Sequence, residues 1–190
     1  MTKTRCTWCG NDAVYKKYHD TEWGVPLHDD RQLFAMLILE GAQAGLSWLT
    51  ILKKRQSYYD AFDQFNVEKI AAYTDNDRKR LMENKGIVRN RLKIDAAIKN
   101  ARGSLAIIKE YGSLSKYLWR YVDHSTLQNN WASIEDLPSQ TKESVAMSRD
   151  LKKRGFNFVG PTICYAFMQS TGMVSDHTID CFRHQELKTG

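Results

Sequence analysis

The chain has little proline and no long uninterrupted apolar stretch. The first favours a helical protein, and the second excludes a membrane-spanning one. Only three of its 190 residues are proline, and hardly any segment alternates apolar and polar side chains with β-branched residues, as half-buried strands do. No apolar run approaches the ~20 residues that a membrane-spanning helix needs, because Glu40 and the triplet 53–55 (Lys-Lys-Arg) interrupt the longest candidates. We therefore expect a soluble, all-α protein.

The first residues also lack the features of a secretory signal. The opening Met-Thr-Lys-Thr-Arg-Cys has neither the apolar stretch nor the small-residue cleavage site of such a signal. We expect a cytoplasmic protein. In a reducing compartment its four cysteines are expected to be thiols or metal ligands rather than disulfides.

The composition is that of an ordinary globular chain, with 42% hydrophobic and 26% charged residues. A chain of this length can bury a core without disulfides, and we expect one domain over residues 1–190. The formal net charge of +6, from 28 Lys+Arg and 22 Asp+Glu, favours a polyanionic partner such as nucleic acid or an acidic membrane surface. Many basic enzymes share this balance, so the charge alone does not identify the partner.

The spacing of apolar residues predicts a series of helices. One begins at Asp29 or Asp30 and places Leu33, Met36, Leu37, Glu40 and Ala44 on one face. Another covers 46–62 and is expected to bury Leu49, Leu52, Tyr59 and Phe62. Shorter helices start at 67 and 75, the second ending before a left-handed Gly86. Further helices are expected over 89–111, ended by Gly112, and over 114–122, 144–154 and 161–171, with a loop over 123–140.

Cysteine and histidine residues are placed near both ends of the sequence. Cys6 and His19 lie near the start, whereas His177 and Cys181, four residues apart, would share one face of a helical turn near the end. A closed tetrahedral Zn²⁺ site takes four such ligands, so we expect one structural zinc ion joining the two ends. Cys9 is a competing ligand because it forms a Cys-x2-Cys pair with Cys6. Without a metal, all of them would be ordinary thiols and imidazoles.

Glu40 is the one charged residue on the apolar stripe of its helix. A buried ionised carboxylate is costly unless donors surround it. Glu40 therefore either reaches solvent or an arginine at the helix end, or it lies at the base of a pocket. The first quarter of the chain is rich in large aromatic residues, namely Trp8, Tyr15, Tyr18, Trp23 and Trp48. Such residues can simply form a core, but stacking and edge hydrogen bonds also hold extruded nucleobases.

A glycine-bracketed turn joins the last two predicted helices. Residues 152–161 read Lys-Lys-Arg-Gly-Phe-Asn-Phe-Val-Gly-Pro, with Gly155 and Gly160 at the ends of the turn. Glycine lets backbone N–H groups approach a phosphate closely, and a following helix N-terminus favours an anion. Residues 144–171 are therefore typical of a helix-hairpin-helix clamp on a DNA backbone. A plain helical hairpin with a solvated basic end is the alternative.

Three long segments, in order and in register, closely resemble the 3-methyladenine DNA glycosylase I family of the helix-hairpin-helix superfamily. They are 18–26 (YHDTEWGVP), 39–48 (LEGAQAGLSW) and 152–165, which begins KKRGF. The resemblance covers nearly the whole chain and implies a mostly α-helical fold whose termini are joined by zinc. The family's zinc ligands fall on Cys6, His19, His177 and Cys181. Cys9 falls on no ligand position.

The resemblance also implies a base-binding pocket and a DNA contact. Glu40, the candidate catalytic residue, would accept hydrogen bonds from the edge of the modified adenine, and Trp48 would stack on that base. The pocket would be lined by Tyr18, Tyr15, Trp8 and Trp23. Gly45 and Leu46 fall where the family inserts into the space that the extruded nucleotide leaves in the DNA stack.

Two features of related superfamily members are absent. Ser175 aligns with the catalytic aspartate of many relatives and Asp176 is displaced by one position. We therefore expect Asp176 to support the neighbouring His177 or to cap a helix, rather than to act in catalysis. The hairpin region also lacks the nucleophilic lysine of bifunctional relatives, so strand cleavage is not expected.

The resemblance implies an N-glycosyl hydrolase that releases 3-methyladenine from alkylated duplex DNA and leaves an abasic site. We expect it to work as a monomer and without a membrane. One alternative is a non-catalytic, zinc-stapled DNA-binding module. A small-molecule hydrolase with catalytic zinc is a further alternative, although four protein ligands would leave no open coordination position.

Overall fold

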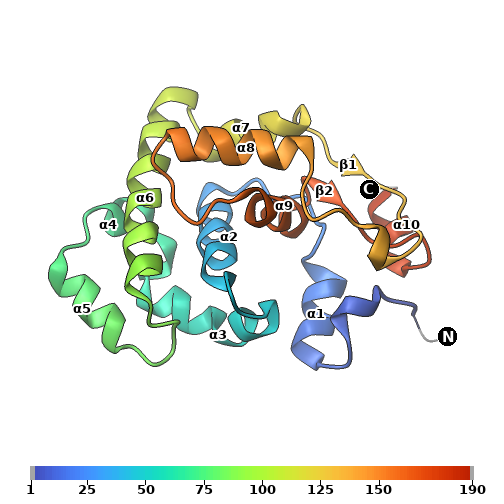
Figure 1. Ribbon diagram of the computed structural model, residues 1–190, viewed down its shortest axis with the longest axis horizontal. Coiled ribbons are helices and arrows are strands. Elements are labelled where there is room, and N and C mark those ends of the chain that lie inside the picture. Colours follow the sequence, from blue (N-terminus) through green and yellow to red (C-terminus); the bar gives the residue numbers. More distant parts are fainter. Residues whose placement is uncertain (1–2, 189–190) are drawn as a thin grey trace.

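The protein is described here by a computed structural model covering residues 3–188, which form a helical body with two very short strands (Figure 1). The helices are α1 Ala13–Thr21, α2 Asp30–Gln43, α3 Trp48–Ala61, α4 Val67–Ala71, α5 Asp75–Glu83, α6 Arg91–Tyr111, α7 Leu114–Trp119, α8 Lys142–Lys153, α9 Pro161–Ser170 and α10 Phe182–Lys188. Single 3-10 turns cover Thr7–Cys9, Asp63–Phe65, Arg120–Val122 and Ile134–Asp136. The strands are β1 Leu127–Gln128 and β2 Val174–Ser175.

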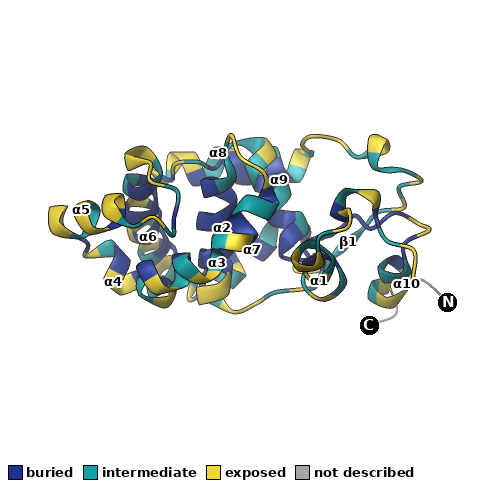
Figure 2. Ribbon diagram, turned by 90° about the horizontal axis from the view of Figure 1, so that it is seen from below, coloured by how far each residue is buried: buried dark blue, intermediate teal, exposed yellow. Residues whose placement is uncertain are grey.

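Helix α2 runs through the centre of the molecule and contacts α3, α6, α7 and α9 (Figure 1). Every residue from Leu33 to Ala42 is buried, as the dark blue of α2 in Figure 2 shows. The Asp29 side chain caps the helix by accepting a hydrogen bond from the backbone N–H of Gln32 at 2.9 Å. Because α2 is enclosed on all sides, a charged residue near its end is enclosed with it.

The two ends of the chain lie together on one side of the helical body (Figure 1). The backbone N–H of Phe182 donates to the carbonyl oxygen of Thr4 at 3.0 Å. Nearby, β1 and β2 pair in parallel, with Leu127 opposite Val174. The predicted meeting of the two ends is therefore confirmed for residues 3–188, while residues 1–2 and 189–190 of the expected domain lie outside the described part.

The predicted helical class is confirmed, and most predicted helices are present with ends shifted by a few residues. Gly112 ends α6 in the left-handed region at φ +84°, as expected. Pro161 begins α9 in the first turn, where its missing N–H costs nothing. Within residues 3–188, no helix combines the length and apolar character needed to cross a membrane.

Some local predictions are wrong. Helix α3 buries Ile51 and Tyr58, whereas Leu49 and Tyr59 are only half-buried, because α3 packs against both α1 and α2. Gly86 is not left-handed; a Cβ there would lie 2.7 Å from the Cβ of Ser57. Close approach to α3, rather than backbone conformation, therefore requires glycine there. Helices α1 and α10 and the strand pair were not anticipated.

Candidate functional site

A pocket of about 500 Å³, open to solvent, lies where α1, α2, α3 and α9 meet the loop before α8. Its walls contain all six residues assigned to a base pocket from the sequence, together with five others. They are Trp8, Tyr15, Tyr18, Trp23, Glu40, Gln43, Trp48, Ile134, Leu137, Ala166 and Gln169. Segments from 8 to 169 in the sequence thus build one cavity.

Glu40 lies in this pocket with only 4% of its surface exposed. Burial raises the pKa of its carboxyl to about 8, and a hydrogen bond with Ser170 opposes the rise only in part. No ion pair to Glu40 exists among residues 3–188. The arginine partner and the solvent-exposed position considered from the sequence are therefore both absent, and Glu40 is a buried, protonatable acceptor in the pocket wall.

The aromatic residues meet one another at steep angles around Trp8. The Trp8 ring lies 4.9 Å from Tyr15 and 4.9 Å from Trp23, at 61° and 69°. On the other wall, the rings of Tyr18 and Trp48 are 5.6 Å apart. The indole Nε1 atoms of Trp8 and Trp48 are buried and have no hydrogen-bond partner. Unpaired buried donors are uncommon in folded proteins.

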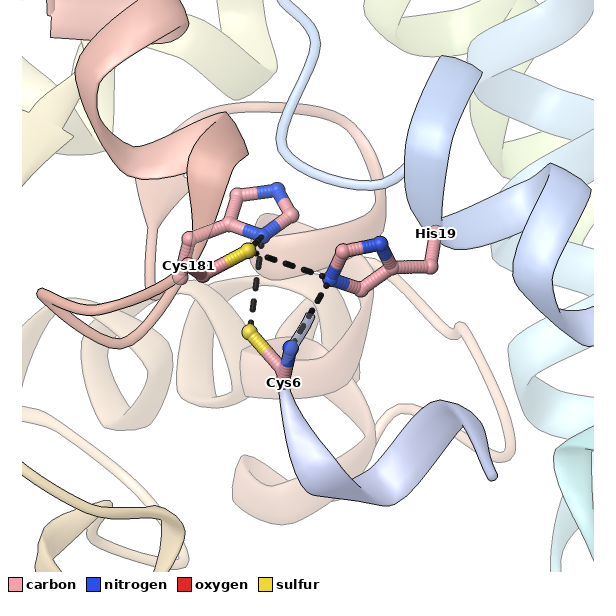
Figure 3. A group of neighbouring side chains, drawn as sticks. Cys6, His19 and Cys181 are labelled. Atoms are coloured by element: carbon pink, nitrogen blue, oxygen red, sulfur yellow. Dashed lines mark hydrogen bonds between the residues drawn. The ribbon is translucent and has the colours of Figure 1, made fainter. Parts of the chain in front are cut away.

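The four predicted metal ligands come together in one buried group. The ligand atoms of Cys6, His19, His177 and Cys181 all lie within 4.8 Å of one another. Figure 3 shows the side chains of Cys6, His19 and Cys181 directed toward a common centre. The Sγ of Cys181 is 3.5 Å from both the Nε2 of His19 and the Nδ1 of His177. The group could hold a metal ion, and Cys9 is not part of it.

The second nitrogen of each histidine is occupied in the way that metal ligands require. The Nδ1 of His19 contacts the Asp20 carboxylate at 2.8 Å, and the Nε2 of His177 contacts the carbonyl oxygen of Trp23 at 3.1 Å. These acceptors favour the tautomer that leaves the other nitrogen free to face the sulfurs.

The metal-ligand group directly adjoins the aromatic pocket. His177 reaches the backbone of Trp23, a pocket residue. The His19 ring lies 5.3 Å from Trp8, and His19 follows Tyr18 on α1. Joining the chain ends and shaping the pocket therefore depend on the same segments.

A tight turn after α2 presents an apolar side chain to solvent beside the pocket. Gly45 adopts φ +78° with open space around it, and Leu46 is 41% exposed. The Nζ of Lys93 donates to the carbonyl oxygens of Ala42 and Ala44, each at 2.7 Å. These two bonds hold the turn in place and, with Gln43 and Trp48 in the pocket wall, keep Leu46 next to the pocket mouth.

Helices α8 and α9 flank the turn 155–160, which is held firmly by α6. Asn100 of α6 donates to the carbonyl oxygen of Asn157 at 3.0 Å and accepts from its backbone N–H at 2.8 Å. Gly155 is left-handed at φ +86°, whereas Gly160 has an ordinary φ of −62°. A Cβ on either glycine would meet nothing within 4 Å, so both offer open backbone to a partner.

The basic triplet before this turn is divided between two roles. Lys152 and Lys153 are exposed, but Arg154 is turned inward and pairs with Glu110 at 2.7 Å. Its guanidinium also lies over the ring of Tyr111. Arg154 therefore anchors the end of α8 to α6, and only the two lysines remain free to meet a phosphate.

Five pocket residues were missed from the sequence, and three of them share a helical spacing with another pocket residue. Gln43 lies three residues after Glu40 and so on the same face of α2, and Ala166 and Gln169 have that same spacing on α9. Ile134 and Leu137 come from the 123–140 loop, where nothing in the sequence indicates that they return to the pocket.

A family profile for methyladenine glycosylases matches residues 8–184. The DNA-3-methyladenine glycosylase of Haemophilus influenzae is 48% identical over 178 residues, which cover 94% of this chain and 96% of that protein. A crystal structure of 3-methyladenine DNA glycosylase I superposes with a TM-score of 0.92 at 49% identity, covering 94% of this chain and 98% of that one. The Staphylococcus aureus enzyme, solved to explain its recognition of 3-methyladenine, superposes at 0.91 with 41% identity, covering 94% of this chain and 95% of its own.

Proposed function

The chain belongs to the methyladenine glycosylase family, and on this basis we propose that it hydrolyses the N-glycosidic bond of 3-methyladenine in alkylated duplex DNA. It is an enzyme of base-excision repair that releases the free base. The other product is an abasic site. The observation that carries the proposal is the buried Glu40 in the wall of an aromatic pocket.

The pocket suits a flat, cationic base. Trp48 offers a stacking surface, and Glu40 offers acceptor oxygens to the exocyclic amino group. A nearby positive charge favours the ionised form of a carboxyl. Arrival of the methylated, cationic base would therefore shift the pKa of Glu40 down from its raised value of about 8. A neutral base brings no positive charge to stabilise the ionised form of Glu40. The pocket therefore binds the methylated base in preference to an undamaged one.

The chemistry needs little acid catalysis from the protein. Methylation at N3 has already made the base a cation, so it leaves as a neutral molecule when the glycosidic bond breaks. Extruding the nucleotide, holding the base against Trp48 and excluding ill-matched groups are the main contributions of this chain. No lysine lines the pocket in the described part of the chain, which supports a monofunctional hydrolase that does not cut the strand.

Two surface features would contact the DNA duplex. Leu46, at the tip of the turn after α2, would fill the space that the extruded nucleotide leaves. The backbone at Gly155 and Gly160, with the exposed Lys152 and Lys153, would hold phosphates without reading sequence. One chain supplies the pocket, the turn and the hairpin, which supports a single domain acting as a monomer.

The four Cys and His ligands are assigned to one structural Zn²⁺ ion. With usual Zn–S and Zn–N bond lengths, a tetrahedral site places neighbouring sulfur and nitrogen ligands ~3.6 Å apart. The sulfur–nitrogen distances of 3.5 Å here agree with that value. Four protein ligands leave no position for water, so the ion would hold the chain ends and supply no chemistry to base release.

The test is chromatography of bases freed from methylated duplex DNA. We expect 3-methyladenine in the supernatant and intact strands carrying abasic sites. Glu40→Gln should excise 3-methyladenine measurably more slowly than the wild type, and identical rates would refute the pocket assignment. DNA binding without any base release would instead identify a non-catalytic binding module.

A further inference from the structure

Asp176 lies between the metal-ligand group and the pocket and uses both carboxylate oxygens completely. It is 1% exposed. Its Oδ1 accepts from the Nδ2 of Asn129 and the Nε1 of Trp131, each at 2.7 Å. Its Oδ2 accepts from the hydroxyl of Tyr165 at 2.6 Å and the Nε2 of Gln169 at 2.7 Å. With four donors around it, Asp176 has no free lone pair with which to activate water.

The consequence of this network for Gln169 is a fixed side-chain amide. An amide can rotate to present either its NH2 group or its carbonyl oxygen. Here the NH2 group is bound to a carboxylate, which only accepts, so the reverse orientation would place two acceptors against each other. Gln169 is therefore held with Nε2 toward the interior and Oε1 on the opposite side.

Oε1 of Gln169 is the part of the amide left for the pocket. Gln169 lines the pocket, whereas Asp176 does not. Oε1 accepts no hydrogen bond from any of residues 3–188, and it is not among the fully enclosed side-chain atoms that lack a partner. The pocket wall thus carries a second, permanently neutral acceptor besides Glu40.

A donor on the substrate must meet this acceptor. The 3-methyladenine nucleotide has acceptors at N1 and N7, a methyl group at N3 and the sugar at N9. Its only strong donors are the two hydrogens of the exocyclic amino group. Glu40 can take one of them and Gln169 the other. A base with an oxygen in place of the amino group would place a second acceptor against Oε1 of Gln169, which is unfavourable.

We propose that Gln169 is a specificity-determining residue whose Oε1, oriented by Asp176, accepts a hydrogen bond from the exocyclic amino group of the bound base. This inference rests on the proposed function and identifies a further base contact on α9. Asp176 is in this view a positioning residue that links the 129–131 loop, α9 and the segment after β2.

The experiment compares two substitutions that each remove one donor from Asp176. Gln169→Met removes the donor and the pocket acceptor, whereas Asn129→Leu removes a donor outside the pocket. Affinity for free 3-methyladenine is measured with the metal-loaded full chain, by quenching of tryptophan fluorescence. We expect Gln169→Met to weaken binding about tenfold and Asn129→Leu to change it less than about twofold, even though both lower the melting temperature.

A second probe, 3-methylpurine, has hydrogen in place of the amino group. The wild type and Gln169→Met should bind it within about twofold of each other, because the lost contact does not exist for this molecule. Gln169→Ala repeats the comparison if the methionine variant does not fold, since α9 is half-exposed at this position.

Three results would overturn the inference. They are unchanged 3-methyladenine affinity in the Gln169 variants, equal losses in the Gln169 and Asn129 variants, and equal losses for the two probes. The last result would mean that Gln169 holds water or merely packs. If the wild type neither binds nor releases 3-methyladenine, the proposed function itself fails, which is a distinguishable outcome.

Discussion

Replacing Glu40 by glutamine should change how the stability of the protein depends on pH. The wild-type carboxyl keeps its proton in the folded chain until the pH approaches its pKa of about 8, whereas the value for an unperturbed glutamate is 4.5. Between these values the folded state binds more protons than the unfolded state. Stability is therefore lost as the pH rises through this window. Glutamine is neutral throughout and carries no such dependence.

The magnitude follows from the difference in pKa. Linkage gives a loss of about 3 kcal/mol in wild-type stability between about pH 5 and about pH 8 that the Glu40→Gln variant does not share. For a chain of this size, that corresponds to roughly 6–12 °C in melting temperature. All other groups titrate in both proteins, so their contributions cancel in the difference.

Thermal melts of both proteins at the two pH values measure this effect. The melting temperature of Glu40→Gln should rise relative to the wild type as the pH is raised. Glu83→Gln, which removes an exposed carboxylate on α5, should follow the wild type at both pH values. A difference between wild type and Glu40→Gln that stays constant with pH would refute the conclusion that Glu40 is a neutral, buried acid.

Other perturbations test the remaining parts of the site. Trp48→Ala should lose about 1–3 kcal/mol of affinity for free 3-methyladenine, and an unchanged fluorescence titration would contradict stacking. Metal analysis should find one zinc per chain, and chelation should lower the melting temperature and alter the near-UV circular dichroism of the pocket aromatics. An unchanged spectrum would show that the metal-ligand group does not shape the pocket. Replacing Lys152 and Lys153 by alanine should weaken duplex binding and reduce the slope of log affinity against log salt by about two. An unaltered slope would mean that other residues contact the DNA phosphates. Lys93 holds the turn that carries Leu46, so Lys93→Met should slow excision from duplex DNA with no change in affinity for the free base. A comparable loss of excision rate and of free-base affinity would mean that the substitution distorts the pocket.

Much of the fold was predictable because its signals are local. Asp29 caps α2 and Gly112 ends α6 through contacts within a few residues. Helical spacing placed Glu40 on the same face as Leu33 and Leu37, although it left open whether the side chain reached solvent, an arginine or a pocket. The metal ligands could be proposed because few residue types bind zinc and they occur in a recognisable pattern.

The rest depends on contacts between distant segments, which spacing does not encode. The buried face of α3 is set by two different neighbouring helices. The need for glycine at 86 comes from Ser57. The orientation of Gln169 depends on Asp176, which in turn collects donors from 129 and 131. Only the folded chain brings these groups within hydrogen-bonding distance.

The joining of the chain ends has a consequence for the order of events during synthesis. Cys6 meets His177 across 171 positions of sequence, and His19 meets Cys181 across 162. On the ribosome, the first two ligands emerge long before the last two exist. Trp8 and Trp23 lie against this group, so the earliest-made wall of the pocket takes its final form only when one of the last segments has been translated. A nascent or truncated chain lacking that segment would contain Glu40 and Trp48 but no finished pocket.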